Sequence, residues 1–367
     1  MHRFLYGNDF CTVNDFTETD HPLFSACTKF FQQVVLLTCW IPVIASAGPA
    51  HAGQATAAPM KPPAVSTHTQ SVILFILEGI DRHSLKIGPM PTLNRLAIEG
   101  ATTWSAHTVA PPLRLPAMAS LLTGLPIDQH GISWNTFEFS RGYPRPPTLF
   151  DYLDLGGGLD SAIFFMDESL YQLAKPAPYT DYQVCGLLRP ECNPDRLVAY
   201  IRQYLKKASS GHGYGHAVLA LPHLLVVHLP APERAGTAHG WSSKEYRDAL
   251  RSVDHAMRAT LDLFKEHGLL ARTTIFVTAL NGTGVGQAPT AGAKPPTTTD
   301  SPLVPWIVSG AGIKGGHTIQ QPVSILDTGA TVMRTLAVDT HTEWESRVVE
   351  EVFQNPPAVA SASSTSR

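Results

Sequence analysis

Three apolar stretches of the chain are each followed by a polar residue that could bind a ligand or take part in catalysis. Residues 71–77 lead directly into Glu78, residues 224–229 come shortly before Glu233, and residues 273–278 come shortly before Asn281. A carboxylate binds cations or accepts protons, and an amide both donates and accepts hydrogen bonds. These residue types therefore define a candidate site if the fold brings them together.

The surrounding pattern predicts parallel strands that alternate with helices. The run 71–77 is apolar and rich in β-branched residues, which is typical of a strand buried on both faces. The predicted strands are residues 71–77, 160–165, 224–229, 273–278 and 304–309, and the predicted helices are residues 92–98, 115–122, 194–207, 244–267 and 324–336. Pro305 favours an edge or a strand-start position for the last strand. Ligands of such α/β sheets bind at the carboxyl ends of the strands.

The amino-acid composition limits the kinds of partner that the protein is expected to bind. The chain has 367 residues, of which 44% are hydrophobic and 16% charged, so most of it is expected to be globular. Its net charge of −3 gives no electrostatic basis for binding nucleic acid or anionic lipid. A small ligand or a protein partner remains.

The two ends of the chain do not read as part of the fold. Residues 30–47 are apolar but interrupted, and Ala50-His51-Ala52 fits a small-x-small cleavage signal. We expect residues 1–52 to be a secretory leader, with a retained membrane anchor as the alternative, and residues 53–70 to be a flexible linker. The folded domain is predicted over residues 71–354, followed by a disordered tail over residues 355–367. Secretion or a periplasmic location follows, or a membrane tether if the leader is kept.

Two of the five cysteines, Cys185 and Cys192, lie in the predicted domain. In an exported protein, two closely spaced cysteines favour a local disulfide. A metal-binding pair is the alternative, although no neighbouring set of Cys or His partners supports it.

Read in order, several segments resemble the alkaline phosphatase superfamily, and within it the nucleotide pyrophosphatase/phosphodiesterase branch. The strongest match is residues 111–124, which resemble the nucleophile segment, followed by His130-Gly131 and Asn135. Further matching segments are residues 72–79, 91–101, 232–240, 305–316 and 327–331. The resemblance spans residues 71–338. It implies an alkaline-phosphatase-like three-layer sandwich with a central, mostly parallel sheet.

The resemblance also implies a site with two divalent metals and a Thr or Ser nucleophile, and here this chain departs from the family. Glu78 and Glu233 stand where the family has metal-binding aspartates. Thr237 stands in place of a histidine ligand, and Leu280-Asn281 stand in place of an Asp-His pair. A site that has lost most of its ligands should lose nearly all its metal affinity. We therefore expect no metal cofactor, with zinc or another divalent metal only if the site has been rebuilt.

Arg114 occupies the nucleophile position. Its guanidinium has no nucleophilic oxygen and stays protonated, but its planar fork can pair with carboxylates. We predict an ion cluster of Arg114 with Glu78 and Glu233 in place of the metals. The alternative is that Arg114 points into solvent from a decayed site.

Two functions follow from these residues. The first is a non-catalytic pseudoenzyme that binds a protein partner or a small anionic ligand in the old cleft, with Arg114 as anion contact and Glu78, Glu233 and Asn281 as further candidates. The second is an active phosphodiesterase or sulfatase-type hydrolase with a rebuilt one-metal or metal-free site. That enzyme needs a new nucleophile, for which Thr108, Ser120 and Thr283 are candidates.

Overall fold

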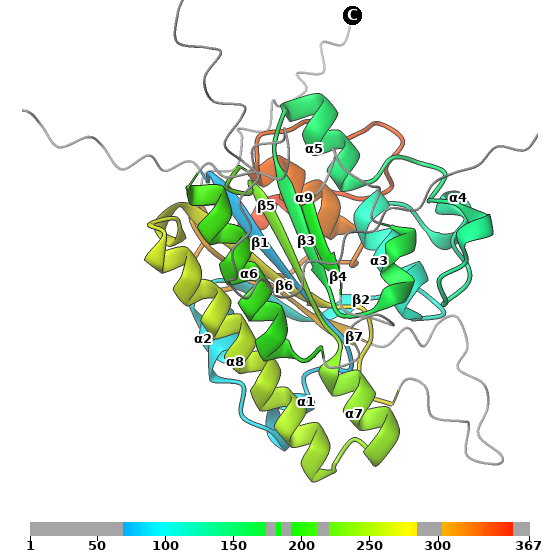
Figure 1. The fold of residues 1–367 in the computed structure, drawn as a ribbon, viewed down its shortest axis with the longest axis vertical. Coiled ribbons are helices and arrows are strands. Elements are labelled where there is room, and N and C mark those ends of the chain that lie inside the picture. Colours follow the sequence, from blue (N-terminus) through cyan, green and yellow to red (C-terminus); the bar gives the residue numbers. More distant parts are fainter. Residues whose placement is uncertain (1–68, 174–180, 185–191, 211–219, 285–302, 355–367) are drawn as a thin grey trace, which may run out of the picture. The chain divides into compact units, whose positions relative to one another are not determined.

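The computed structural model describes residues 69–173, 181–184, 192–210, 220–284 and 303–354 (Figure 1). At its centre is an eight-stranded sheet with the strand order β4-β3-β5-β1-β6-β7-β2-β8. The strands are β1 (Ser71–Leu77), β2 (Ala101–His107), β3 (Ser161–Phe165), β4 (Asp181–Val184), β5 (Leu224–Leu229), β6 (Thr273–Ala279), β7 (Leu303–Gly310) and β8 (His317–Thr318). Only β7 runs antiparallel to its neighbours, so the predicted mostly parallel sheet is confirmed.

Strand β1 forms the middle of the sheet because every one of its side chains is apolar or small enough to bury. All seven of its residues are buried. It pairs in parallel with β5 on one side and with β6 on the other, placing Leu77 beside Leu229 and Ala279. The three strands therefore end at the same level, and the residues that follow them meet at one rim of the sheet.

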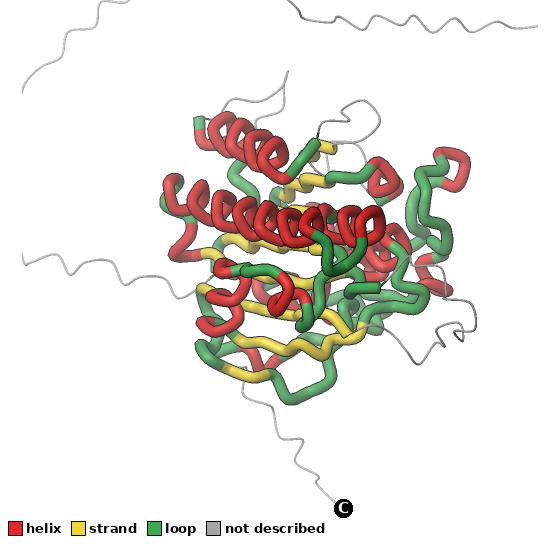
Figure 2. Tube along the Cα trace, turned by 90° about the horizontal axis from the view of Figure 1, so that it is seen from below, coloured by secondary structure: helices red, strands yellow, loops and turns green. Residues whose placement is uncertain are grey.

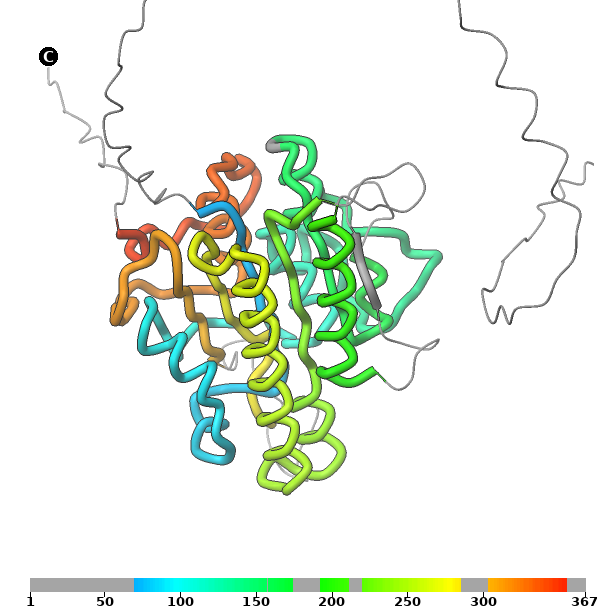
Figure 3. Tube along the Cα trace, turned by 60° about the vertical axis from the view of Figure 1, so that its left-hand side comes forward, coloured from blue at the N-terminus to red at the C-terminus, as the bar shows by residue number. Residues whose placement is uncertain are grey.

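Helices cover both faces of the sheet. They are α1 (Ser84–Ile87), α2 (Pro91–Glu99), α3 (Arg114–Thr123), α4 (Ile127–His130), α5 (Leu149–Gly157), α6 (Pro194–Ser209), α7 (Ala231–His239), α8 (Lys244–Glu266) and α9 (Asp327–Thr335), with short 3-10 helices η1 (Phe139–Arg141), η2 (Glu168–Gln172), η3 (Leu270–Arg272) and η4 (Glu350–Val352). Helix α8 contacts α2, α6 and α7, whereas α3, α5 and α9 contact one another. Figure 3 shows α6 and α8 side by side, and Figure 2 shows helices packed over the yellow strands. The three-layer α/β sandwich is confirmed.

The longest helix follows its predicted pattern closely. Ser243 caps the start of α8 by accepting a hydrogen bond from the backbone N–H of Tyr246. Its buried residues include the predicted apolar stripe Tyr246, Leu250, Val253, Met257, Leu261 and Phe264. Gly268, with a φ of +69°, lies just past its end.

Two local features were not predicted correctly. Helix α7 (Ala231–His239) covers most of the matching segment 232–240 but was not among the predicted helices, and Pro232 lies in its first turn, where the missing N–H costs nothing. Of the two positions predicted for Pro305, the edge strand is wrong, because β7 lies between β6 and β2, but Pro305 does lie near the start of β7 as its third residue. The lost N–H is tolerated because β2 has a register irregularity opposite this point, between Thr103 and Ala106.

Several expectations concern residues that the structure does not describe. The leader and almost all of the linker, the C-terminal tail and Cys185 lie outside the described ranges. Cys192 is described and is disulfide-bonded. None of the described helices is long and apolar enough to cross a membrane.

Candidate functional site

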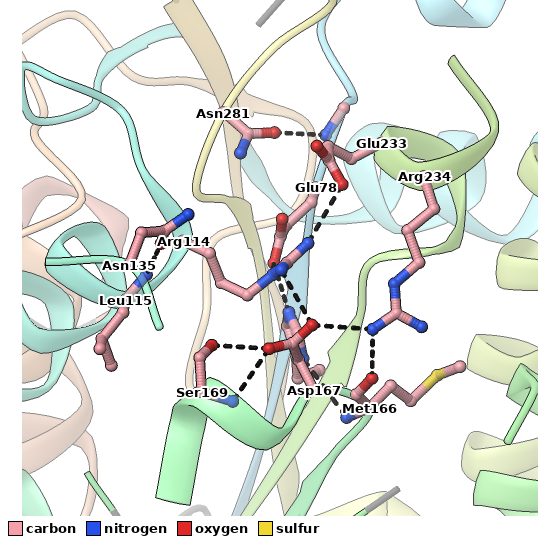
Figure 4. A network of polar contacts seen from close by, with 12 residues as sticks. Glu78, Arg114, Leu115, Asn135, Met166, Asp167, Ser169, Glu233, Arg234 and Asn281 are labelled. Atoms are coloured by element: carbon pink, nitrogen blue, oxygen red, sulfur yellow. Dashed lines mark hydrogen bonds and ion pairs between the residues drawn. The ribbon is translucent and has the colours of Figure 1, made fainter. Parts of the chain in front are cut away.

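A cluster of charged side chains lies at the rim where β1, β3 and β5 end (Figure 4). Glu78 directly follows β1, and Asp167 lies two residues after β3. Arg114 is the first residue of α3, and Glu233 lies in the first turn of α7. We call Glu78, Arg114, Asp167, His228 and Glu233 the ion cluster.

Arg114 stands at the centre of this cluster. Its Nε donates to Oε1 of Glu78 over 2.7 Å, its Nη1 to Oδ2 of Asp167 over 2.9 Å, and its Nη2 to Oε2 of Glu233 over 3.1 Å. The Arg114 side chain is 15% exposed. The predicted ion cluster is therefore present, and the alternative that Arg114 points into solvent is wrong. A cation at the start of a helix opposes the helix dipole, which the three carboxylates offset.

Glu78 is the most deeply buried carboxylate of the cluster. Its Oε1 also accepts a hydrogen bond from Nε2 of His228 over 2.6 Å, while Oε2 is buried without a hydrogen-bond partner among the described residues. Burial raises the pKa of Glu78, but Arg114 and His228 outweigh burial and lower it to about 2. Glu78 is therefore a carboxylate at every physiological pH.

His228 serves as a neutral hydrogen-bond donor. Its Nδ1 accepts from the backbone N–H of Met166 over 3.4 Å, which leaves the proton on Nε2 facing Glu78. Burial lowers the pKa of His228 below its usual range, in agreement with a neutral imidazole. The ring thus supports Glu78 without adding a charge.

Asp167 joins the cluster to a second arginine. Its Oδ2 accepts from both Arg114 and Arg234, each over 2.9 Å, and its Oδ1 accepts from the N–H and Oγ–H of Ser169 at the start of η2. Burial raises the pKa of Asp167, but Arg114 and Ser169 hold it below its usual range. Arg234 also donates to the carbonyl of Met166 over 2.5 Å, which ties α7 to the end of β3.

Glu233 behaves differently from the other two acids. Burial and the nearby charge of Glu78 raise the pKa of Glu233 above its usual range despite its contact with Arg114. Oγ1 of Thr237, one turn further along α7, lies 3.4 Å from Oε1 of Glu233. Among the three carboxylates of the cluster, Glu233 is therefore the one that takes up a proton most readily.

Negative charge exceeds positive charge in the cluster, because His228 is neutral and Arg114 is its only cation. Three carboxylates face the guanidinium of Arg114, with Arg234 on the outer side of Asp167. Arg114 thus supplies internally the positive charge that paired carboxylates require. An anionic ligand at Arg114 stays a prediction, and the carboxylates that surround the guanidinium count against it.

Asn281 holds the backbone of the site. Its Oδ1 accepts from the N–H of Gly79 over 2.6 Å, and its side chain is buried. Gly79 has a φ of +70°, and a Cβ there would lie 2.6 Å from Cα of Glu233. Only glycine allows α7 to approach the end of β1 this closely. This contact explains Asn281 without a ligand.

The residues present do not fit the two-metal site that the resemblance implies. Thr237 is exposed and offers only a hydroxyl, and the Leu280 side chain is fully buried. The carbonyl of Leu280 accepts from Oγ1 of Thr108 over 2.6 Å. Arg114 meanwhile occupies the space between the remaining carboxylates. Within the described ranges, no group of three or more His, Cys, Asp or Glu side chains is arranged to hold a metal ion.

The candidate nucleophiles are engaged elsewhere. Ser120 lies 2.9 Å from Nε2 of His130, but both side chains are fully buried in the core. Nδ1 of His130 accepts from the N–H of Ile132, so Nε2 carries the proton and cannot act as a base toward Ser120. Thr283 donates to Asp81, and Thr108 donates to Leu280 as described above.

Sequence reasoning missed Asp167, His228 and Arg234. Asp167 had a usable signal, because the strand at residues 160–165 was predicted and its carboxyl end points to the same rim. His228 lies inside the apolar run Leu224–Leu229, where position in the sequence does not reveal a role. Only the pairing of His228 with Ile76 places it on the face of the sheet that also carries Glu78.

Solved structures with the same architecture include animal and bacterial proteins. Human ectonucleotide pyrophosphatase/phosphodiesterase 5 has a TM-score of 0.59 at 13% identity, with 78% of this chain and 100% of that chain covered. The murine protein, solved as an inactive form in complex with AMP, has a TM-score of 0.57 at 13% identity, over 74% of this chain and 96% of that chain.

A protein from a Bacteroides thetaiotaomicron locus for the metabolism of multiple glycosaminoglycans has a TM-score of 0.58 at 15% identity, over 80% of this chain and 78% of that chain. At these identities the likeness establishes the fold alone.

The sequence comparison identifies the family. No curated protein matches the chain. The family described as type I phosphodiesterase/nucleotide pyrophosphatase matches residues 72–284, which agrees with the predicted branch of the alkaline phosphatase superfamily. Because this match spans more than half of the 367 residues, the chain belongs to the type I phosphodiesterase/nucleotide pyrophosphatase family.

Proposed function

We propose that this protein is an exported, non-catalytic member of the family, in which an internal ion cluster takes the place of the metal centre. The protein acts by binding a protein partner or a small ligand and does not turn over an ester. The family fold is retained because its surface binds the partner or ligand, whereas ester hydrolysis is no longer needed.

The observation that carries this proposal is the position of Arg114. Its guanidinium donates to Glu78, Asp167 and Glu233 from the residue that corresponds to the nucleophile. A hydrolase of this family needs an attacking oxygen at this residue and cations beside it. Arg114 provides no attacking oxygen, and its guanidinium takes the place of the cations.

The hydroxyl group of Ser169, which contacts the cluster, supports the same conclusion. Ser169 donates to Asp167 over 2.6 Å, but Ser169 is buried and Arg114 keeps the pKa of Asp167 low, which makes Asp167 a poor base. Asp167 instead caps the start of η2 by accepting from the backbone N–H of Ser169.

A hydrolase with a rebuilt site is the alternative, and one contact favours it. Thr237 is exposed and lies 3.4 Å from Oε1 of Glu233, whose pKa burial and Glu78 raise toward the range useful for a general base. If activity exists, Thr237→Ala should abolish it.

Metal analysis combined with an esterase assay tests the proposal. Residues 53–367 are purified, dialysed and analysed for zinc and manganese, then assayed on bis-p-nitrophenyl phosphate and p-nitrophenyl sulfate. We expect no stoichiometric metal and no turnover. Arg114→Thr restores a hydroxyl but not the lost ligands, so it should also be inactive.

Two other results would contradict the proposal and show that the protein is a hydrolase. Near-stoichiometric metal in the wild-type protein, with turnover that Glu78→Ala removes, would establish a working hydrolase. Turnover that persists in Glu78→Ala but disappears in Thr237→Ala would establish a metal-free one.

Export rests on the sequence of the N-terminal segment. The leader over residues 1–52 directs the chain to the periplasm or the exterior, and a retained leader would tether it to the membrane. N-terminal sequencing of the protein recovered from the native cell fraction separates the two, because cleavage would leave a start near Gly53.

A further inference from the structure

A groove of about 720 Å³ lies away from the ion cluster, beside strand β2. Its walls come from the end of α2, from β2 and from the segment that contains β8. The lining residues on which the argument depends are Arg82, Asn94, Trp104, His317, Gln320 and Gln321. No residue of the groove belongs to the cluster, and its volume is typical of a small-molecule site.

The groove exists because two neighbouring segments separate and rejoin. Thr102 pairs with Thr318, and its carbonyl accepts from the N–H of Ile319. The segments meet again where the N–H of His107 donates to the carbonyl of Val323. Between these points the described backbone groups of residues 103–106 and 320–322 do not bond to one another. The register irregularity of β2 falls at the same place.

The outer wall of the groove is fixed by a carboxylate behind it. Glu351 accepts from the backbone N–H groups of Gln320 and Gln321 and from Nε2 of His317. Burial raises the pKa of Glu351, but these hydrogen bonds lower it below its usual range, so it remains ionised. The wall is therefore held in place before any ligand arrives, which reduces the entropy lost on binding.

The chemistry of the lining is selective. It contains one aromatic platform, Trp104, together with amides, hydroxyls and imidazoles that donate and accept hydrogen bonds. Arg82 is its one permanently charged residue, and no carboxylate lines it. Among the described residues, Arg82 makes no ion pair.

We propose that this groove binds an anionic oligosaccharide. The indole of Trp104 offers an apolar face for the C–H groups of a pyranose ring, with a polar N–H at its edge. The amides of Asn94 and Gln321 suit sugar hydroxyls, which both donate and accept. Arg82 suits a carboxylate or sulfate group through its planar fork. One cation is too few for a nucleic acid, whose affinity depends on several phosphate contacts.

Calorimetry with defined hexasaccharides tests the proposal at 0.15 M salt. The probes are a heparin-derived hexasaccharide, hexagalacturonic acid and its fully methyl-esterified, uncharged form. We expect saturable binding of at least one charged probe and at least tenfold weaker binding of the ester. Two charged probes are used because the guanidinium of Arg82 can form paired hydrogen bonds with either a sulfate or a carboxylate group.

Three variants locate the site. Trp104→Ala should weaken binding of the charged probe at least tenfold, and Arg82→Gln should weaken it until it matches that of the neutral ester. Arg95→Gln is the matched control, because Arg95 is exposed on α2 beside Asn94 but does not line the groove, and it should bind as the wild type does. Unfolding temperatures verify that each variant is folded.

Three results would overturn the inference. They are no saturable binding at millimolar concentration, preference for the uncharged ester, or equal binding by folded Trp104→Ala, Arg82→Gln and Arg95→Gln. None of these results bears on the ion cluster, so the inference and the proposed function succeed or fail separately.

Discussion

Arg114 donates its Nε–H to Oε1 of Glu78 over 2.7 Å, in a place where the Glu78 side chain is only 1% exposed. A carboxylate buried this deeply is costly unless a positive charge meets it inside the protein. In relatives with metals, divalent cations meet that need. In this chain the guanidinium of Arg114 supplies that positive charge.

Removing the arginine should destabilise the fold strongly. Arg114→Met keeps the bulk of the side chain but leaves Glu78 without its cation, and breaking a buried pair costs about 3–5 kcal/mol. Neutralising the acid as well, in Arg114→Met/Glu78→Gln, should recover a large part of that loss. Denaturant unfolding measures both. Arg234→Ala is the control: its side chain is 43% exposed, so its loss should cost about 1 kcal/mol or less.

The acidic side chains are not arranged to hold a metal while Arg114 lies between them, but they should accept one if they can close on the space that the guanidinium leaves. Arg114→Ala leaves Glu78, Asp167 and Glu233 around the space that Arg114 filled, with His228 bonded to Glu78. Carboxylate oxygens and imidazole nitrogen are suitable ligands for Mn²⁺ and Zn²⁺. At 1 mM Mn²⁺, a Kd of about 10 μM would stabilise the variant by about 2.7 kcal/mol.

Thermal unfolding with and without Mn²⁺ measures this effect, with Mg²⁺ for comparison. The wild type and Arg234→Ala should not respond, because Arg114 still fills the space in both. An equal response of all three proteins would show that the metal acts elsewhere.

Acid should weaken the fold through Glu78. Its pKa falls from 4.5 in the unfolded chain to about 2 in the folded protein. A depressed carboxyl pKa contributes stability that is present above pH 4.5 and is lost as the pH falls toward 2. The contribution is about 3 kcal/mol. Glu78→Gln should flatten the stability profile in this window relative to the wild type, as measured by urea unfolding at several pH values.

His130 should act in a higher window and in the same direction. Burial lowers the pKa of His130 from 6.5 to about 4. The unfolded chain therefore binds a proton that the folded protein refuses, so stability is full above pH 6.5 and falls between pH 6.5 and 4. His130→Gln should be less stable at pH 7 but show a shallower fall in this range. An unchanged slope would mean that His130 does not titrate there.

The sequence predicted the centre of the site better than its surroundings. The family resemblance placed Glu78, Arg114 and Glu233 in one cleft, and charge predicted that they pair, because two acids that lose their metals require a cation. Asp167 was within reach of the same logic, since it follows a predicted strand. His228 was not, because its role depends on which strand lies beside β1, and the order of parallel strands is set by tertiary packing.

The elements of the fold divide in the same way, into those with a pattern in the sequence and those that depend on tertiary contacts. Strand β1 and helix α8 were predicted because a buried strand and an amphipathic helix each leave a clear periodic pattern. Strand β2 was missed because Ala101–His107 is largely polar and pairs through its backbone. Helix α7 was missed because its Pro, Gly and Ala residues are typical of a loop, whereas in the fold its first turn is held by Arg234 and by the approach to Gly79.

That approach gives the sharpest structural test. In Gly79→Ala the new Cβ would lie 2.6 Å from Cα and 2.7 Å from the backbone N of Glu233, neither of which can rotate away. The residue would also keep a φ of +70°, which costs an L-residue about 1–2 kcal/mol. Overpacking adds about 1–3 kcal/mol. We expect a total loss of about 3 kcal/mol or more in urea unfolding, together with movement of α7.

Gly158→Ala separates the two causes. Gly158 has a φ of +58° and a Cβ there would have no neighbour within 4 Å, so the substitution should cost only the backbone share, about 1–2 kcal/mol. If both variants lose the same stability, the contact between Gly79 and α7 is not tight. If Gly79→Ala loses clearly more, the contact between the end of β1 and α7 is tight at Glu233, the residue whose Oε2 lies 3.1 Å from Nη2 of Arg114.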